Sequence, residues 1–129
     1  MKKRITVYGS LLEGLSNWGW HLDNDESTKL GEHILEGGFK MISMGGFPGL
    51  IQDESVNNKI FVETYEVSDR VFKSVERLEG YPHFYDRVMV DTPFGDSEVY
   101  VLASGAGNDR LVPSNDDGVI NWREYKTKR

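Results

Sequence analysis

Alternating apolar and polar positions predict several short strands along the chain. The clearest run, residues 59–67, places Ile60 and Val62 on one face and Phe61 and Tyr65 on the other. Other alternating or β-branched segments predict strands at residues 3–9, at 28–46 with a bend at the glycine pair, after the turn at 47–53, and as a hairpin at 83–104.

Residues 68–80 have helical periodicity instead. Ser68 is a favourable N-cap, and Gly80 is a natural stop after the last turn. The apolar positions fall on one stripe of this helix, formed by Val71, Phe72, Val75 and Leu78. Elsewhere we expect only a short helix near residues 11–15, inside a loop, and a short ordered segment at the carboxyl end.

An acidic residue interrupts the apolar stripe of the helix. At about 100° per residue, Glu79 lies roughly 50° from the centre of the stripe, whereas Glu76 lies outside it. Glu79 is therefore predicted to point toward the core or a cleft, where burial would raise its pKa toward the range useful for proton transfer. The alternative is a frayed helix end, with Glu79 exposed or paired with Arg87 or Lys73.

Length and composition limit the class of protein. The chain has 129 residues, which predicts a single domain over residues 1–129, and its order of elements lacks any βαβ rhythm. We expect an α+β fold with a small, mixed, mostly antiparallel and barrel-like sheet, one main helix and short flanking helices. The chain contains no cysteine, which excludes disulfides and a cysteine nucleophile.

Charge and hydropathy limit the classes of partner that we expect. The formal net charge is −6, which disfavours binding to nucleic acid. No apolar run approaches the length of a membrane span, and polar residues interrupt the amino-terminal segment where a signal peptide would need an apolar region. We therefore expect a cytoplasmic protein with no membrane partner; the sequence leaves the oligomeric state open.

A glycine ends the first predicted strand, in the sequence Tyr8-Gly9-Ser10-Leu11. Glycine lets a ligand approach the backbone closely, and successive N–H groups in such a turn can bind an anion or an oxyanion. The alternative is an ordinary turn between a strand and a loop.

Taken together, these segments resemble the gamma-glutamylcyclotransferase-like family, and most closely its small branch, which includes gamma-glutamylamine cyclotransferase and the plant avirulence-induced proteins. The resemblance rests on four stretches in the order of the family: "VYGSLLEGLSN", "GGFPGLI", "VETYEVSDRVFKSVERLEGYPHFYDRVMV" and "NWREYKTKR". It implies a barrel-like fold, a substrate loop formed by residues 8–11, and Glu79 as the catalytic acid and base.

The resemblance also implies a reaction that needs no metal or cofactor. The α-amine of a γ-glutamyl amine or amide attacks its own side-chain carbonyl, which releases 5-oxoproline and a free amine in a transferase- or lyase-type cyclisation. Tyr85 and Arg87 share one strand face and are candidates for substrate binding, although Arg87 is equally suited to a structural pair with Glu63 or Asp91. The competing hypothesis is a catalytically inactive module that binds a small ligand or a partner protein through the same pocket.

Overall fold

The computed structural model describes residues 2–102 and 110–127. The end of the expected hairpin, residues 103 and 104, and the last two residues of the chain lie outside this part. The elements follow in the order β1 Lys3–Val7, α1 Ser16–His21, β2 Ser27–Gly37, β3 Phe39–Ser43, β4 Pro48–Gln52, β5 Asn58–Val67, α2 Asp69–Glu79, β6 Tyr85–Thr92, β7 Gly95–Leu102 and α3 Trp122–Thr127.

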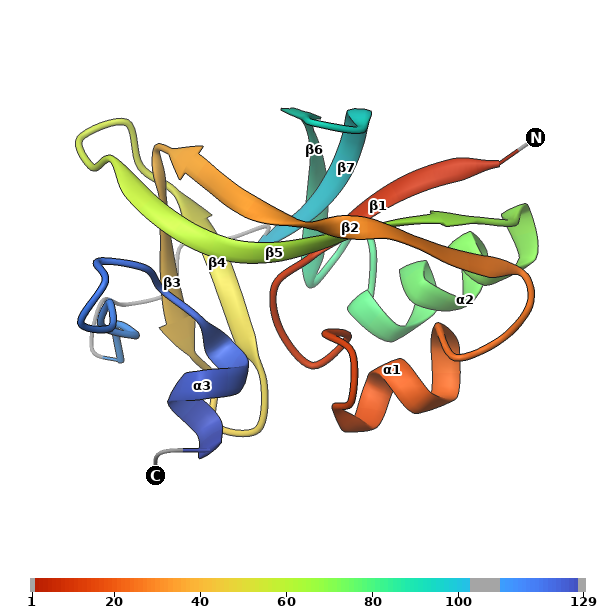
Figure 1. The fold of residues 1–129 in the computed structure, drawn as a ribbon, viewed down its shortest axis with the longest axis horizontal. Helices are drawn as coiled ribbons and strands as arrows, with labels where there is room; N and C mark the ends of the chain where they lie inside the picture. The colour runs from red at the N-terminus through yellow and green to blue at the C-terminus, as the bar shows by residue number, and fades with distance from the viewer. Residues whose placement is uncertain (1, 103–109, 128–129) are drawn as a thin grey trace.

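The strands form two sheets. A five-stranded sheet has the order β2-β5-β1-β7-β6, and β3 pairs with β4 in a separate hairpin. Strand β1 runs antiparallel to β5 and parallel to β7, and the other pairs are antiparallel. The expected mixed, mostly antiparallel α+β fold is confirmed, but the described strands form an open curved sheet with a packed hairpin, not a closed barrel (Figure 1).

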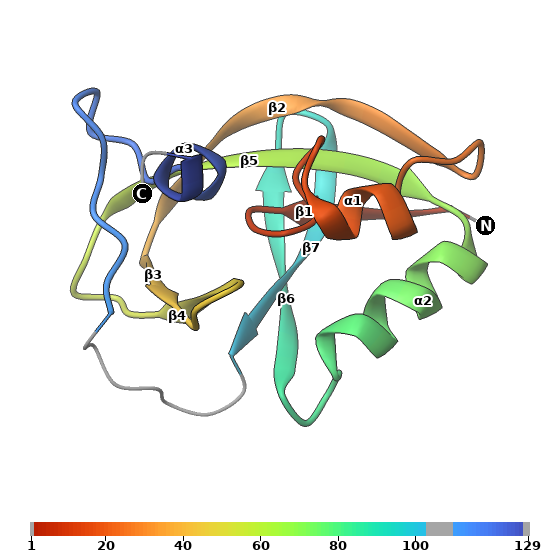
Figure 2. The same cartoon turned by 90° about the horizontal axis from the view of Figure 1, so that it is seen from below.

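The smaller elements lie against this curved sheet in two groups. Helices α1 and α2 lie together under one half of the sheet, and the β3–β4 hairpin lies with α3 under the other half (Figures 1 and 2). The loop that leaves β1 runs between the two groups (Figure 2). The end of β1 is thereby brought near the end of α2 and the start of β4.

Helix α2 forms where its periodicity predicts it. The Ser68 hydroxyl caps the first turn by accepting a hydrogen bond from the Val71 amide at 3.2 Å. At the other end Gly80 adopts a left-handed conformation with φ of 65°, which ends the helix immediately after Glu79. Leu78 differs from the prediction: it is 38% exposed, while the rest of the apolar stripe is buried. The buried stripe therefore centres closer to Glu79.

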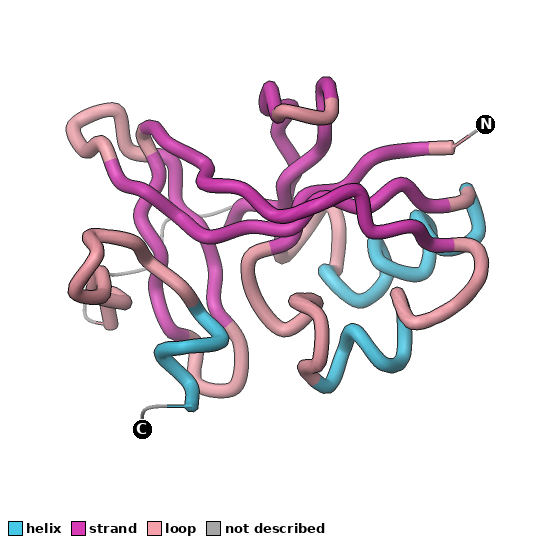
Figure 3. Tube along the Cα trace, viewed as in Figure 1, coloured by secondary structure: helices cyan, strands magenta, loops and turns pink. Residues whose placement is uncertain are grey.

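The prediction of a short helix near residues 11–15 is wrong. That segment is a loop, and α1 begins after it at Ser16 (Figure 3). The carboxyl-terminal segment is ordered as predicted, since Trp122 on α3 is 1% exposed and its ring lies 5.5 Å from that of Tyr125. Within residues 2–102 and 110–127, no helix combines the length and the apolar character that crossing a membrane requires.

Candidate active site

A cavity of about 390 Å³ opens between the two groups of smaller elements. This volume falls in the range that accommodates small molecules. Its walls come from the end of β1 and the following loop, α1, the β3–β4 turn, the end of α2, β6 and β7. The lining residues are Thr6, Val7, Tyr8, Gly9, Ser10, Leu11, Asn17, Phe47, Pro48, Leu78, Glu79, Gly80, Phe84, Tyr85 and Tyr100.

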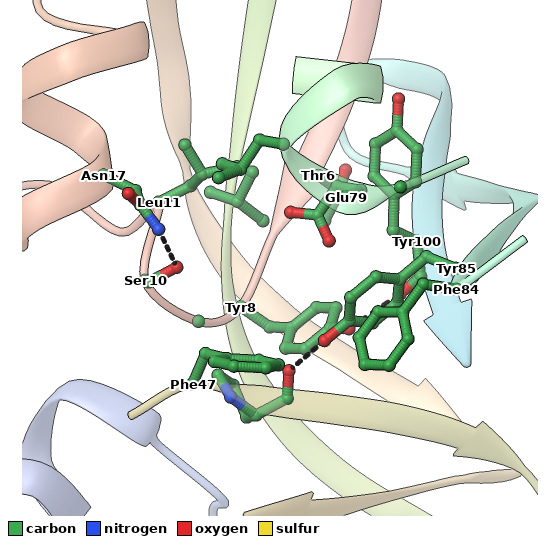
Figure 4. A pocket seen from close by; sticks show the side chains of 15 residues that line it. Thr6, Tyr8, Ser10, Leu11, Asn17, Phe47, Glu79, Phe84, Tyr85 and Tyr100 are labelled. Carbon is green, nitrogen blue, oxygen red and sulfur yellow. Dashed lines mark hydrogen bonds between the residues drawn. The ribbon is translucent and has the colours of Figure 1, made fainter. Parts of the chain in front are cut away.

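Among the described residues that line the cavity, only Glu79 has a side chain that is ordinarily charged at neutral pH. Its carboxylate points into the cavity, between the Ser10–Leu11 loop and the Tyr85 ring (Figure 4). Burial raises the pKa of this carboxyl from 4.5 to about 7. Among the described residues it has no hydrogen bond or ion pair, so neither Arg87 nor Lys73 neutralises it.

The loop opposite Glu79 presents unused backbone donors. Among the described residues, the N–H groups of Ser10 and Leu11 have no acceptor within the chain. The Leu12 amide donates to the Gly9 carbonyl at 2.9 Å, and the Asn17 amide nitrogen donates to Ser10 Oγ at 2.7 Å. These bonds hold the turn in place and tie it to α1, while the free N–H groups remain available to an anion.

Gly9 allows the loop to lie close to β4. A Cβ added at Gly9 would come within 2.6 Å of Pro48 Cγ and 2.7 Å of Pro48 Cδ. Any side chain at this position would therefore push the loop and the β3–β4 hairpin apart. The glycine thus permits close approach of a neighbouring strand, and the close approach of a ligand at Gly9, which also lines the cavity, stays a prediction.

The hydroxyls of Tyr8 and Tyr85 form hydrogen bonds that connect different walls of the cavity. Tyr8 Oη donates to the Tyr100 carbonyl at 2.7 Å and accepts from the Leu50 amide at 3.2 Å. Tyr85 Oη donates to the Pro48 carbonyl at 2.7 Å. Burial raises the pKa of both phenols above the ordinary value, so both remain neutral near pH 7. Both residues line the cavity and fix the β3–β4 hairpin against β1, β6 and β7.

Arg87 does not line the cavity, unlike the other residues singled out from the sequence. Its guanidinium pairs with Glu76 and with Glu98, the latter at 3.4 Å, rather than with Glu63 or Asp91. It also lies over the rings of Phe72 and Tyr81. Because it pairs with Glu76, Arg87 meets α2 about one helical turn before Glu79.

Several lining residues were not singled out from the sequence as site residues. Phe47 precedes β4 and Phe84 follows α2, yet their ring centroids lie 6.2 Å apart at the cavity. Tyr100 sits on β7, and its buried hydroxyl has no hydrogen-bond partner among the described residues. Only the tertiary fold brings these aromatic residues to one place.

The arrangement suits proton transfer beside an anion site. A carboxyl with a pKa near neutrality can both accept and donate a proton, and the backbone N–H groups across the cavity can bind a carboxylate or a developing oxyanion. Among residues 2–102 and 110–127, no cluster of three or more His, Asp or Glu side chains is arranged to hold a metal ion.

The sequence of this chain matches a known protein family. Residues 5–124 match the model of the family described as gamma-glutamyl cyclotransferase, AIG2-like. A Vibrio cholerae protein, provisionally named a gamma-glutamylcyclotransferase, is 28% identical over 116 residues, which cover 90% of this chain and 96% of the relative.

Solved structures share the fold. An uncharacterized protein from Pyrococcus horikoshii has a TM-score of 0.74 and 25% identity, with 98% of this chain and 94% of that one covered. A mouse AIG2-like protein shares the fold, with a TM-score of 0.70 and 22% identity over 83% of this chain and 81% of that one. This chain belongs to the gamma-glutamyl cyclotransferase, AIG2-like family.

Proposed function

We propose that this protein is a gamma-glutamyl cyclotransferase that converts a γ-glutamyl amine or amide to 5-oxoproline and a free amine. The observation that carries the proposal is the Glu79 carboxylate, which has a pKa of about 7 and no ion pair among the described residues. It shares the cavity lining with Ser10 and Leu11, whose N–H groups have no acceptor in the described part of the chain. Family membership supports the same reaction class.

The first step is a proton transfer. Glu79 takes a proton from the α-ammonium group of the substrate, which frees the nitrogen lone pair. That nitrogen attacks the γ-carbonyl carbon of the same molecule and forms a five-membered ring. Because nucleophile and electrophile belong to one molecule, the protein contributes chiefly by holding the reactive conformer.

The second step breaks the bond between the γ-carbon and the leaving nitrogen. Glu79, now protonated, gives its proton to that nitrogen as the bond breaks. The regenerated carboxylate takes the second proton from the ring nitrogen and passes it to the departing amine, which leaves as an ammonium ion while Glu79 is again a carboxylate. The N–H groups of Ser10 and Leu11 bind the substrate carboxylate or the oxyanion formed between the two steps. The neutral hydroxyls of Tyr8 and Tyr85 hold β4 in position at the cavity wall.

Incubation with a panel of γ-glutamyl amides and dipeptides, with detection of 5-oxoproline, tests the proposal. Glu79→Gln keeps the size of the side chain and removes its ability to exchange a proton, so we expect turnover to fall at least about 100-fold. Glu54→Gln, a neutralisation of an exposed residue outside the cavity, is the matched control. Binding without turnover in the wild type would identify a ligand-binding module instead, and full activity in Glu79→Gln would remove Glu79 from the mechanism.

A further inference from the structure

Glu63 on β5 is a second buried carboxylate, and the proposed reaction does not use it. Its side chain is 0% exposed. The carboxylate accepts hydrogen bonds from the Glu13 amide at 2.8 Å, the Tyr65 hydroxyl at 3.1 Å and Arg123 Nη1 at 3.2 Å. Lys29 Nζ lies 3.6 Å from the same group. The described residues that line the cavity include none of these five, so any effect on the reaction must be indirect.

The network converges on Glu13, two residues after the end of the substrate loop. The Glu13 amide donates to Glu63, its carbonyl accepts from Arg123 Nη1 at 2.7 Å, and its carboxylate accepts from Lys29 Nζ at 2.8 Å. These partners lie on β5, α3 and β2. Three elements that are distant in sequence therefore set the position of the chain at Glu13. We call Glu13, Lys29, Glu63 and Arg123 the loop anchor.

The substrate loop is thereby held on both sides. At its start the Tyr8 hydroxyl is bonded to backbone groups of β7 and β4. After its end the loop anchor holds Glu13. The N–H groups of Ser10 and Leu11, which have no acceptor in the described part of the chain, lie between these two fixed points. Their position therefore depends on where the two ends are held.

The energetics of the loop anchor favour a positioning role. Buried ion pairs contribute little to stability compared with well-packed apolar side chains, because both charges lose their hydration. A buried polar network whose members all have partners instead makes the local structure rigid. Both oxygens of the Glu63 carboxylate have such partners. Groups that bind a substrate must be held within about 0.5 Å of the productive geometry, and a rigid support supplies this.

We propose that the loop anchor is a positioning device, which holds the substrate loop in the conformation that binds the substrate. Arg123 and Lys29 are then positioning residues that act through Glu13 and touch no substrate. The proposal gives the carboxyl-terminal helix α3, which lies with the β3–β4 hairpin, a part in the site (Figure 2). The kinetic part of the inference rests on the proposed cyclotransferase function.

Arg123→Met tests the proposal by removing the cation and its donors while keeping an unbranched stem beside the Phe61 ring. We expect kcat/KM for 5-oxoproline release from γ-glutamyl benzylamide to fall about tenfold. The loss is smaller than the 100-fold or more that follows removal of an oxyanion donor, because the loop N–H groups remain but are less well placed. Arg123→Lys should restore kcat/KM to within about twofold, since one nitrogen makes both bonds of Arg123 and an ammonium group can replace it.

Nuclear magnetic relaxation of the Ser10 and Leu11 amides reports the position of the loop without turnover. We expect order parameters of about 0.85 in the wild type and in Arg123→Lys, and a fall toward about 0.6 in Arg123→Met. Lys29→Met removes another bond to Glu13 and should change the order parameters and kcat/KM in the same direction.

Arg70→Met is the matched control for both measurements. It removes an arginine that pairs with Glu26 at the start of α2, outside the loop anchor and the cavity lining. Each variant is measured under conditions in which urea denaturation shows it to be folded, and Lys29→Met decides the outcome if Arg123→Met does not fold. We expect the control to keep the order parameters and kcat/KM of the wild type.

Three results would overturn the inference. One is unchanged order parameters at Ser10 and Leu11 in the folded variants of Arg123 and Lys29. The second is a fall in kcat/KM without a change at these amides, and the third is increased loop motion with wild-type kcat/KM.

Binding of 5-oxoproline, measured by calorimetry, separates failure of the inference from failure of the proposed function. Arg123→Met should weaken this binding about tenfold, and Arg123→Lys should restore it. If these changes and the increased loop motion are found but the wild type cyclises no γ-glutamyl compound, the cyclotransferase function fails while the role of the loop anchor stands. If 5-oxoproline binds equally to the wild type and Arg123→Met, the inference fails whatever the turnover.

Discussion

Replacing Glu79 with glutamine should stabilise the protein, and only at high pH. Burial in the cavity wall raises the pKa of this carboxyl from 4.5 to about 7. The folded protein therefore holds the proton more tightly than the unfolded chain does. Below about pH 4.5 Glu79 is protonated in both states and does not change the free energy of unfolding. Between about pH 4.5 and 7 it lowers the free energy of unfolding by a growing amount. Above about pH 7 this loss of stability is constant. Glutamine is neutral throughout and has no such cost.

The size of the effect follows from the pKa. Each pKa unit corresponds to about 1.4 kcal/mol, so a rise from 4.5 to about 7 represents roughly 3 kcal/mol. The carboxylate faces an open cavity, and water in that cavity reduces the cost. We therefore expect Glu79→Gln to raise the free energy of unfolding by about 2 kcal/mol at pH 8.5 and by almost nothing at pH 4.5.

Urea denaturation of the wild type and the variant at several pH values between 4.5 and 8.5 measures this difference directly. Other titrating groups contribute equally to both proteins and cancel in the comparison. Glu76→Gln is the control: it lies one turn earlier on α2 but pairs with Arg87, so its neutralisation should lower stability at pH 8.5. A stability difference for Glu79→Gln that does not change with pH would refute the reasoning about its burial.

Three further substitutions test the packing around the site by urea denaturation. Gly9→Ala places a Cβ against Pro48 and should cost about 1–3 kcal/mol; an unchanged unfolding midpoint would contradict the close contact. Tyr8→Phe leaves the Leu50 amide and a carbonyl on β7 without their partner and should also cost about 1–3 kcal/mol, whereas wild-type stability would mean that these groups find other partners. Glu63→Gln weakens a fully buried carboxylate's bonds to two cations and should cost about 3 kcal/mol, and a stabilising effect would show that desolvation outweighs pairing there.

The sequence predicted those features that depend on neighbours along the chain. Helix α2 is defined by its own cap, its apolar period and its terminal glycine, all within residues 68–80. The inward direction of Glu79 follows from the same period, because a residue's direction on a helix is fixed by its position in the turn. The β6–β7 hairpin is likewise a local pairing around a short turn.

The position of α1 could not be predicted in the same way. The helix contains Gly19, which disfavours helix, and its N-cap residue Leu15 makes no capping bond through its side chain. Tertiary contacts stabilise this helix although its local propensity is weak. The Asn17 side chain donates to Ser10 Oγ, and His21 bonds to Ser74 on α2 at 2.8 Å.

The contact between Phe47 and Phe84 and the partners of Arg87 depend on pairings between distant segments. Phe47 and Phe84 meet only because Tyr85 and Tyr8 bind the β3–β4 hairpin against the main sheet. The strand face of Arg87 was predictable from alternation, but its contact with Glu76 depends on how α2 lies over β6. Such contacts follow from the packing of the whole chain, and no periodic pattern in the sequence predicts them.

The central claim is that Glu79 exchanges a proton with a γ-glutamyl substrate, and the pH dependence of kcat/KM for 5-oxoproline release from γ-glutamyl benzylamide tests it most directly. Since kcat/KM reports the ionisation of the free enzyme, the account predicts that it rises with pH through an apparent pKa of about 7. Glu79→Gln should be at least about 100-fold slower. A wild-type profile without that rise, or a Glu79→Gln variant that releases 5-oxoproline at the wild-type rate, would contradict it.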